Sequence, residues 1–165
     1  MESALHLGSD TVWIASRLAA ALLAGAILGI NRDLHRKAAG LRTMALVSTG
    51  SAVVVMVSLL MTHGSSDSAS RVIQGVMAGV GFLGAGVIIH HQQENRVEGL
   101  TTAASVWVAA GLGAACGAGL EILALLALIT TMAILLFGCH VERAIERRPL
   151  KDDSKGGGPN SKDVS

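Results

Sequence analysis

Five long apolar runs alternate with short polar segments along the chain. They cover residues 12–30, 43–61, 72–89, 100–118 and 122–139, and of the 13 basic and 12 acidic residues only Arg17 lies within a run. As helices, runs of this length would extend roughly 27 to 28 Å, close to the ~30 Å hydrocarbon thickness of a bilayer. A soluble bundle would need charged outer helix faces, which these runs lack. The pattern therefore predicts an all-α integral membrane protein with about five transmembrane helices.

The basic residues between the runs predict the orientation in the membrane. Eleven of them fall on one side of the bilayer in this topology, and Arg71 is the only one on the other. Because short cytoplasmic segments carry an excess of Lys and Arg, we expect the N-terminus outside and the C-terminus in the cytoplasm. The chain would then comprise an external segment over 1–11, a transmembrane domain over 12–140 and a charged, largely disordered cytoplasmic tail over 141–165. As orientation signals, these residues give no reason to expect nucleic-acid binding.

Composition indicates how the helices pack. The chain has 20 glycines, 2 prolines and only 2% aromatic residues, although 51% of it is hydrophobic. Small residues spaced four apart let transmembrane helices approach closely. We expect the first, third and fourth runs to form the packed centre and the fifth, rich in Leu, Ile and Ala, to face lipid. The residues assigned to this packing are Gly25, Gly29, Gly75, Gly79, Gly81, Gly84, Gly113, Gly117 and Trp107.

Two sequence patterns resemble ligand-binding motifs but lack the structural setting that such sites need. Residues 79–84 read G-x-G-x-x-G, but a dinucleotide site needs a strand before this motif and a helix start after it. His90, His91, Glu94 and Glu98 follow the third run, and on a helix His90 and Glu94 would share a face. A third convergent ligand for a metal is not apparent there, nor is an activated nucleophile or paired carboxylate. We therefore expect no enzyme activity, no metal and no cofactor.

Arg17 is a functional candidate because ionisable residues within membrane spans are rare. Its side chain could extend to the membrane surface, pair with Asp10, Asp67 or Glu121 on the outer side, or serve transport or gating; structural pairing is the simplest interpretation. Other polar residues in the runs are expected to form hydrogen bonds between helices rather than to bind ligands. These are Ser48, Thr49, Ser51, Gln74 and Ser105.

Two similar tetrads open the second and fourth runs. Each places threonine where a helix start needs a capping oxygen, and both helix starts face the cytoplasm in the predicted topology. With basic side chains nearby, they could hold an anion, either a lipid phosphate or a carboxylate of a partner. The alternative is ordinary capping combined with anchoring by the basic residues. The residues assigned to this site are Asn31, Arg32, Asp33, Gly40, Leu41, Arg42, Thr43, Gly99, Leu100, Thr101 and Thr102.

Four motifs in order carry a resemblance to a known family. They occupy residues 29–33, 39–43, 79–86 and 99–107 and read GINRD, AGLRT, GVGFLGAG and GLTTAASVW. Together they resemble the MgtC/SapB family of bacterial inner-membrane proteins. The resemblance covers about residues 15 to 140 and implies a multi-pass protein of the inner (plasma) membrane, with about five spans.

The resemblance also implies a role in adaptation rather than catalysis. Members of the family are linked to growth in low magnesium, to acid tolerance and, in pathogens, to survival inside phagocytes. The implied mode of action is to bind and regulate another membrane protein, with the F-type ATP synthase as one such partner; a homo-oligomer is also compatible. The alternative is a transporter or channel for magnesium or another cation, which the lack of Asp and Glu in the runs disfavours.

The sequence departs from the family pattern in two places. Asn31 stands where the family commonly has glutamate, so a role that needs a carboxylate there is in doubt. The soluble C-terminal domain of longer members has no counterpart in this sequence, so we do not carry over an activity of that domain.

Overall fold

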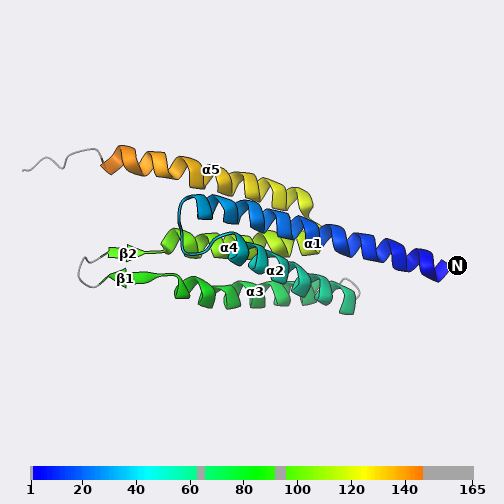
Figure 1. The fold of residues 1–165 in the computed structure, drawn as a ribbon. Coiled ribbons are helices and arrows are strands. Elements are labelled where there is room, and N and C mark those ends of the chain that lie inside the picture. The colour runs from blue at the N-terminus through cyan, green and yellow to red at the C-terminus, as the bar shows by residue number, and fades with distance from the viewer. Residues whose placement is uncertain (1, 63–65, 92–95, 147–165) are drawn as a thin grey trace, which may run out of the picture. The chain divides into compact units, whose positions relative to one another are not determined.

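Helices make up almost all of the regular structure. The computed structural model describes residues 2–62, 66–91 and 96–146, and the surroundings of the side chains within 11–62, 67–88 and 98–138. Two compact units, Met1–Met132 and Ala133–Ser165, divide the chain within its last helix. The elements in order are α1 (Glu2–Leu34), α2 (Leu41–Met61), α3 (Ser66–Gly86), β1 (Ile89–His91), β2 (Arg96–Glu98), α4 (Leu100–Ala118) and α5 (Glu121–Glu146) (Figure 1).

Four of the described helices are long and apolar enough to cross a bilayer. The qualifying segments are Thr11–Leu34, Leu41–Met61, Leu100–Ala118 and Glu121–Gly138. Helix α3 is not among them, because it begins in a polar stretch at Ser66 and ends at Gly86, before the expected end of its span at residue 89. The chain is thus an all-α membrane protein in which α3 falls short of the apolar length of a span.

Both ends of the expected transmembrane domain extend as helix. Helix α1 begins at Glu2, so residues 2–11 of the expected external segment are helical. Helix α5 continues to Glu146, past the expected boundary at residue 140. The rest of the expected tail, 147–165, lies outside the described residues.

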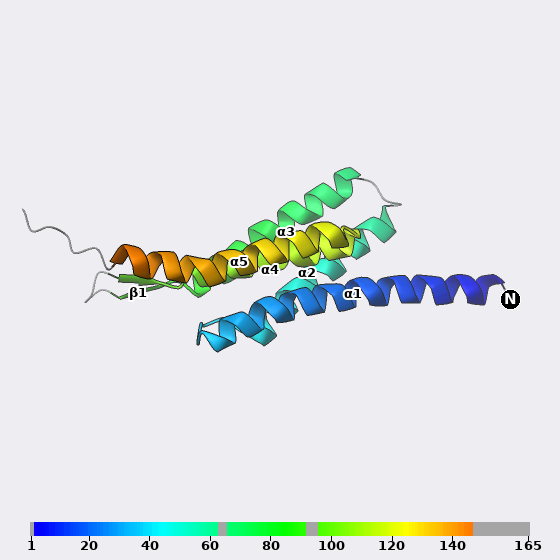
Figure 2. The same ribbon diagram turned by 90° about the horizontal axis from the view of Figure 1, so that it is seen from above.

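In the first unit, helices α1 to α4 run in alternating directions, and α1, α2 and α4 pack against one another (Figures 1 and 2). Helix α3 lies at the edge, against α4 and α2. The expectation that the third run joins the centre is therefore wrong, and α2 takes its place. The reason is that α2 presents small buried residues, among them Ser48 and Ala52, to the glycines of α1 and α4.

A short antiparallel hairpin leads into α4. Strands β1 and β2 pair with Ile89 opposite Glu98 and His91 opposite Arg96. The helix assumed for a shared face of His90 and Glu94 is therefore wrong, because His90 lies in a strand; Glu94 is outside the described residues. Within the described residues, no group of three or more His, Cys, Asp or Glu could hold a metal ion.

Candidate functional site

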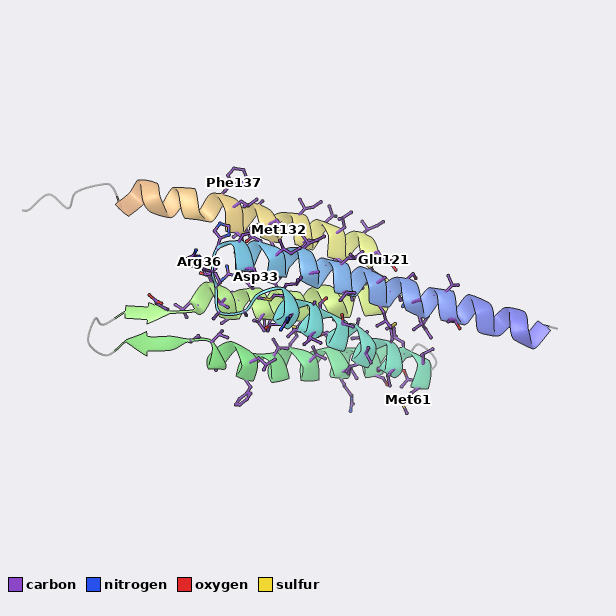
Figure 3. The ribbon with its side chains drawn as sticks, viewed as in Figure 1. Asp33, Arg36, Met61, Glu121, Met132 and Phe137 are labelled. Carbon is purple, nitrogen blue, oxygen red and sulfur yellow. The ribbon has the colours of Figure 1, made fainter. Side chains whose placement is uncertain are left out.

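The end of α1 and the starts of α2 and α4 meet at one end of the first unit, here named the Arg32 end. Figure 3 places Asp33 and Arg36 at the α1–α2 connection there, away from Glu121 at the start of α5. Arg32 is only 3% exposed. Its Nη2 donates a 2.7 Å hydrogen bond to Oγ1 of Thr102, in the first turn of α4. A buried charge at the end of α1 is thereby tied to the start of α4.

Asp33 closes the start of α2. Its Oδ2 accepts a 2.9 Å hydrogen bond from the backbone N–H of Leu41, and its carboxylate occupies the place that a Cβ on Gly40 would take. One turn earlier on α1, a Cβ on Gly29 would lie 2.5 Å from the Cα of Leu41. A carboxylate from α1 therefore caps α2, and two glycines permit the close approach that this requires.

The threonines of the two tetrads do not cap their helices, contrary to expectation. The N-caps are Gly40 for α2 and Gly99 for α4, and neither makes a side-chain capping bond. Thr43 and Thr102 are the third helical residues, too far along to act as an N-cap oxygen. Gly99 has φ +94°, and the carbonyl oxygen of Val87 fills the place of a Cβ, so this position requires glycine.

The structure therefore brings part of the predicted site into contact. The connected residues are Arg32, Asp33, Gly40, Leu41 and Thr102. Four others, Arg42, Thr43, Leu100 and Thr101, are exposed at the same end, and Asn31 is half-buried. Sequence reasoning placed Arg32 in this site but missed its burial, because only the fold reveals that Thr102 covers it.

Arg17 lies towards the other end of α1. Its Nη1 donates a 2.8 Å hydrogen bond to the carbonyl oxygen of Gly117, and its guanidinium carbon lies 4.0 Å from the centroid of the Trp13 ring. Of the three expected carboxylate partners, Asp67 and Glu121 form no ion pair with Arg17, and the side chain of Asp10 lies outside the described part of the chain. Arg17 instead binds one carbonyl near the C-terminal end of α4, and this end of a helix attracts cations. The four-residue spacing of Trp13 and Arg17 is the sequence signal that indicates the ring contact.

Four of the glycines assigned to packing lie within the α1–α2–α4 core, and these are Gly25, Gly29, Gly113 and Gly117. A Cβ on Gly25 would lie 2.6 Å from the Met44 carbonyl oxygen, and one on Gly117 would lie 2.5 Å from the Ala52 carbonyl oxygen. These distances are too short for any side chain, so the helices of the core meet backbone to backbone.

The remaining members of that set are less packed than expected. Gly75, Gly79 and Gly81 on α3 have no atom within 4 Å of the place that a Cβ would take, and a Cβ on Gly84 would make ordinary contact with Ala103 at 3.5 Å. Trp107 is 52% exposed. The expectation of tight packing is therefore wrong for Gly75, Gly79 and Gly81, because α3 lies at the edge of the unit, and for Trp107, which is exposed on α4. Gly84 is buried against α4, as expected.

The small polar residues of the spans behave in different ways. Ser48 is fully buried, and its Oγ donates a 2.7 Å hydrogen bond to the Ala21 carbonyl oxygen, which joins α2 to α1 as expected. Ser105 instead donates to the Thr101 carbonyl oxygen within α4. Only the first of these two hydroxyls stabilises a contact between helices.

Two hollows border the core without entering it. A groove of about 380 Å³ runs between α2 and α3, with Gly50 and Gly79 among its lining residues. A larger hollow of about 740 Å³ lies between α4 and the start of α5, lined by Trp107, Thr130, Thr131 and apolar side chains. Both are surface features of the helix arrangement.

Comparison with known proteins assigns the chain to a family. The model of the MgtC family matches residues 18–144, which include the whole Arg32 end. The chain belongs to the MgtC family. SrpB of Synechococcus elongatus is 44% identical over 136 residues, covering 76% of this chain and 75% of SrpB. MgtC of Salmonella typhimurium is 46% identical over 102 residues, covering 62% of this chain and 42% of that protein.

A third relative, like MgtC of Salmonella typhimurium, is about twice as long as the part that this chain matches. MgtC of Brucella abortus is 41% identical over 120 residues, covering 73% of this MgtC-family chain and 49% of the relative. No solved structure matches the chain. This MgtC-family protein thus covers most of SrpB but less than half of the two MgtC proteins.

Proposed function

We propose that this MgtC-family protein is a regulator in the bacterial inner membrane. In this proposal it acts in adaptation to low magnesium, acid or host intracellular stress by binding another membrane protein. The observation that carries the proposal is the contrast between a closed α1–α2–α4 core and an open glycine face on α3. We assign it no enzymatic reaction.

The closed core argues against ion passage through the protein. Its helices approach so closely that Gly25, Gly113 and Gly117 admit no Cβ. A divalent cation that sheds water needs several oxygen ligands, usually including carboxylates. Among the described side chains, the only charged one that is buried is Arg32, which is itself a cation. Both packing and charge therefore favour work at the surface of the protein over transport through it.

The groove between α2 and α3 is the surface proposed for the partner. Gly50 and Gly79 line it, and neither has an atom within 4 Å of the place of a Cβ. Small residues of this kind let a second transmembrane helix approach closely. The resemblance to the MgtC/SapB family makes the F-type ATP synthase one partner to test, and a second copy of this chain is another.

The basic residues support an orientation for the proposed regulator. Arg36, Lys37 and Arg42 are exposed at the Arg32 end. Because basic residues in short loops favour the cytoplasm, we place this end on the cytoplasmic side.

The test is growth in low magnesium of a bacterial strain that lacks its own MgtC-family protein. The wild-type chain should restore growth. Gly79→Leu should lose this restoration, because it fills the groove without a clash at its Cβ. Gly81→Leu is the matched control, since Gly81 on α3 is equally open but does not line the groove. Restoration by Gly79→Leu at the wild-type level, with equal amounts of protein in the membrane, would contradict the proposal.

A further inference from the structure

Arg32 is a buried cation without a counter-charge in the described part of the chain. Its side chain is 3% exposed and makes one hydrogen bond to the described residues, from Nη2 to Thr102. Its Nε is buried with no hydrogen-bond partner, and no described carboxylate forms an ion pair with it. A guanidinium cannot shed its charge in a protein, and an uncompensated buried charge is strongly destabilising. The position of Arg32 is therefore explained best if an anion joins it.

The first turn of α4, which Arg32 contacts, has no carboxylate partner among the described residues either. Its N-cap Gly99 provides no side-chain oxygen, and the first N–H bonded within the helix is that of Ala103, to the Gly99 carbonyl oxygen at 2.8 Å. The preceding N–H groups of Leu100, Thr101 and Thr102 have no partner within the helix. Such N–H groups and the helix dipole favour a negative charge at this place.

The start of α2 provides an internal comparison. There the carboxylate of Asp33 caps Leu41 from α1, so that helix start already has its anion. At the start of α4 the equivalent neighbour from α1 is the cation Arg32. The other described acid at this end, Glu98, is exposed and precedes the N-cap of α4. Among the described residues, the start of α2 therefore has a carboxylate partner and the start of α4 does not.

We propose that Arg32 and the first turn of α4 bind a phosphate group. Its several oxygens can accept hydrogen bonds from the Nε–H of Arg32 and from backbone N–H groups of α4 at the same time. The site lies where the spans Thr11–Leu34 and Leu100–Ala118 end and begin, which is the depth of lipid headgroups. The phosphate can thus belong to an anionic lipid or be free in solution. The inference does not depend on the proposed partner surface of α3.

The test uses the full chain purified in an uncharged detergent, with two probes. One is short-chain phosphatidylglycerol and the other is inorganic phosphate; binding is measured by native mass spectrometry and by the rise in melting temperature. A response to the lipid alone identifies a headgroup site, and a response to inorganic phosphate identifies a site for free phosphate. Either response supports the proposal if Arg32→Met weakens binding by about 10- to 100-fold. Arg36→Met is the control, since Arg36 is exposed at the same end and should bind like wild type.

A second variant keeps the test decisive if Arg32→Met does not fold. Arg32→Lys retains the charge but loses the planar fork of N–H groups, so it should bind about tenfold more weakly than wild type, while Arg36→Lys should not. The proposal is overturned if neither probe binds the wild-type protein. It is equally overturned if the Arg32 variants bind the probe as tightly as the Arg36 variants.

Discussion

The glycines of the core and those of α3 are alike in sequence but differ in their surroundings. In the core, Gly113 lies directly against the backbone of Ser48 on α2, whereas Gly79 and Gly81 on α3 face open space. The difference arises because α2 carries small buried residues opposite α1 and α4, while α3 has neighbours on one side only. Regular spacing of small residues therefore identifies a face suited to close contact, but not the contact that the folded chain makes.

A side chain added at a core glycine should destabilise the protein far more than one added at a glycine of α3. Gly113→Leu should cost more than about 3 kcal/mol, because a side chain there meets backbone that cannot move aside. Gly81→Leu should change the stability by less than about 0.5 kcal/mol. The measurement is the amount of monodisperse protein in the membrane fraction, followed by gel filtration. If the amounts of the two variants fell equally, the core glycines and the glycines of α3 would not differ in how tightly they are packed.

The hydrogen bond between Arg32 on α1 and Thr102 on α4 should contribute to the stability of the core at the Arg32 end. Thr102→Val removes the acceptor of the Arg32 hydrogen bond but keeps the shape of the side chain. We expect it to destabilise the protein by about 2 kcal/mol, since a buried charged donor loses its partner. Thr101→Val, at an exposed position one residue earlier, is the control and should have little effect. Thermal unfolding in detergent compares the two, and similar melting temperatures for both variants would count against a structural role of this bond.

A smaller effect is expected from the hydroxyl that joins α1 and α2. Ser48→Ala removes the hydrogen bond to the Ala21 carbonyl oxygen and should cost about 0.6 kcal/mol, the average for such bonds between membrane helices. Gln74→Ala, at an exposed position of α3, should cost less. The same unfolding measurement applies, and a greater loss for Gln74→Ala would show that α3 is held more firmly than its contacts indicate.

The helices that coincide with an uninterrupted apolar run, α2 and α4, were predictable from the sequence. The expected runs 43–61 and 100–118 agree closely with Leu41–Met61 and Leu100–Ala118. The run 72–89 was predicted less well because α3 ends at Gly86 and Ile89 already pairs with Glu98 in a hairpin, and hydropathy does not distinguish a strand from the end of an apolar helix. Charge segregation thus predicts where spans lie, while pairing between segments decides where α3 ends.

The candidate site was predictable as a group of residues but not as a set of contacts. The motifs around Arg32 and the two tetrads lie at the same end, as the alternation of helices requires. The capping of Leu41 by Asp33 and the burial of Arg32 against Thr102 depend on how α1 meets α2 and α4. Such contacts between distant residues leave no periodic signal in a single sequence, which is why threonine capping was wrongly expected.

We propose that this MgtC-family protein acts through its surface and does not conduct ions through its core. The most direct test is magnesium uptake by the purified full chain in liposomes, followed with a fluorescent indicator trapped inside. We expect uptake no faster than in protein-free liposomes. Robust uptake that depends on the protein would contradict the proposal and would support the transporter alternative.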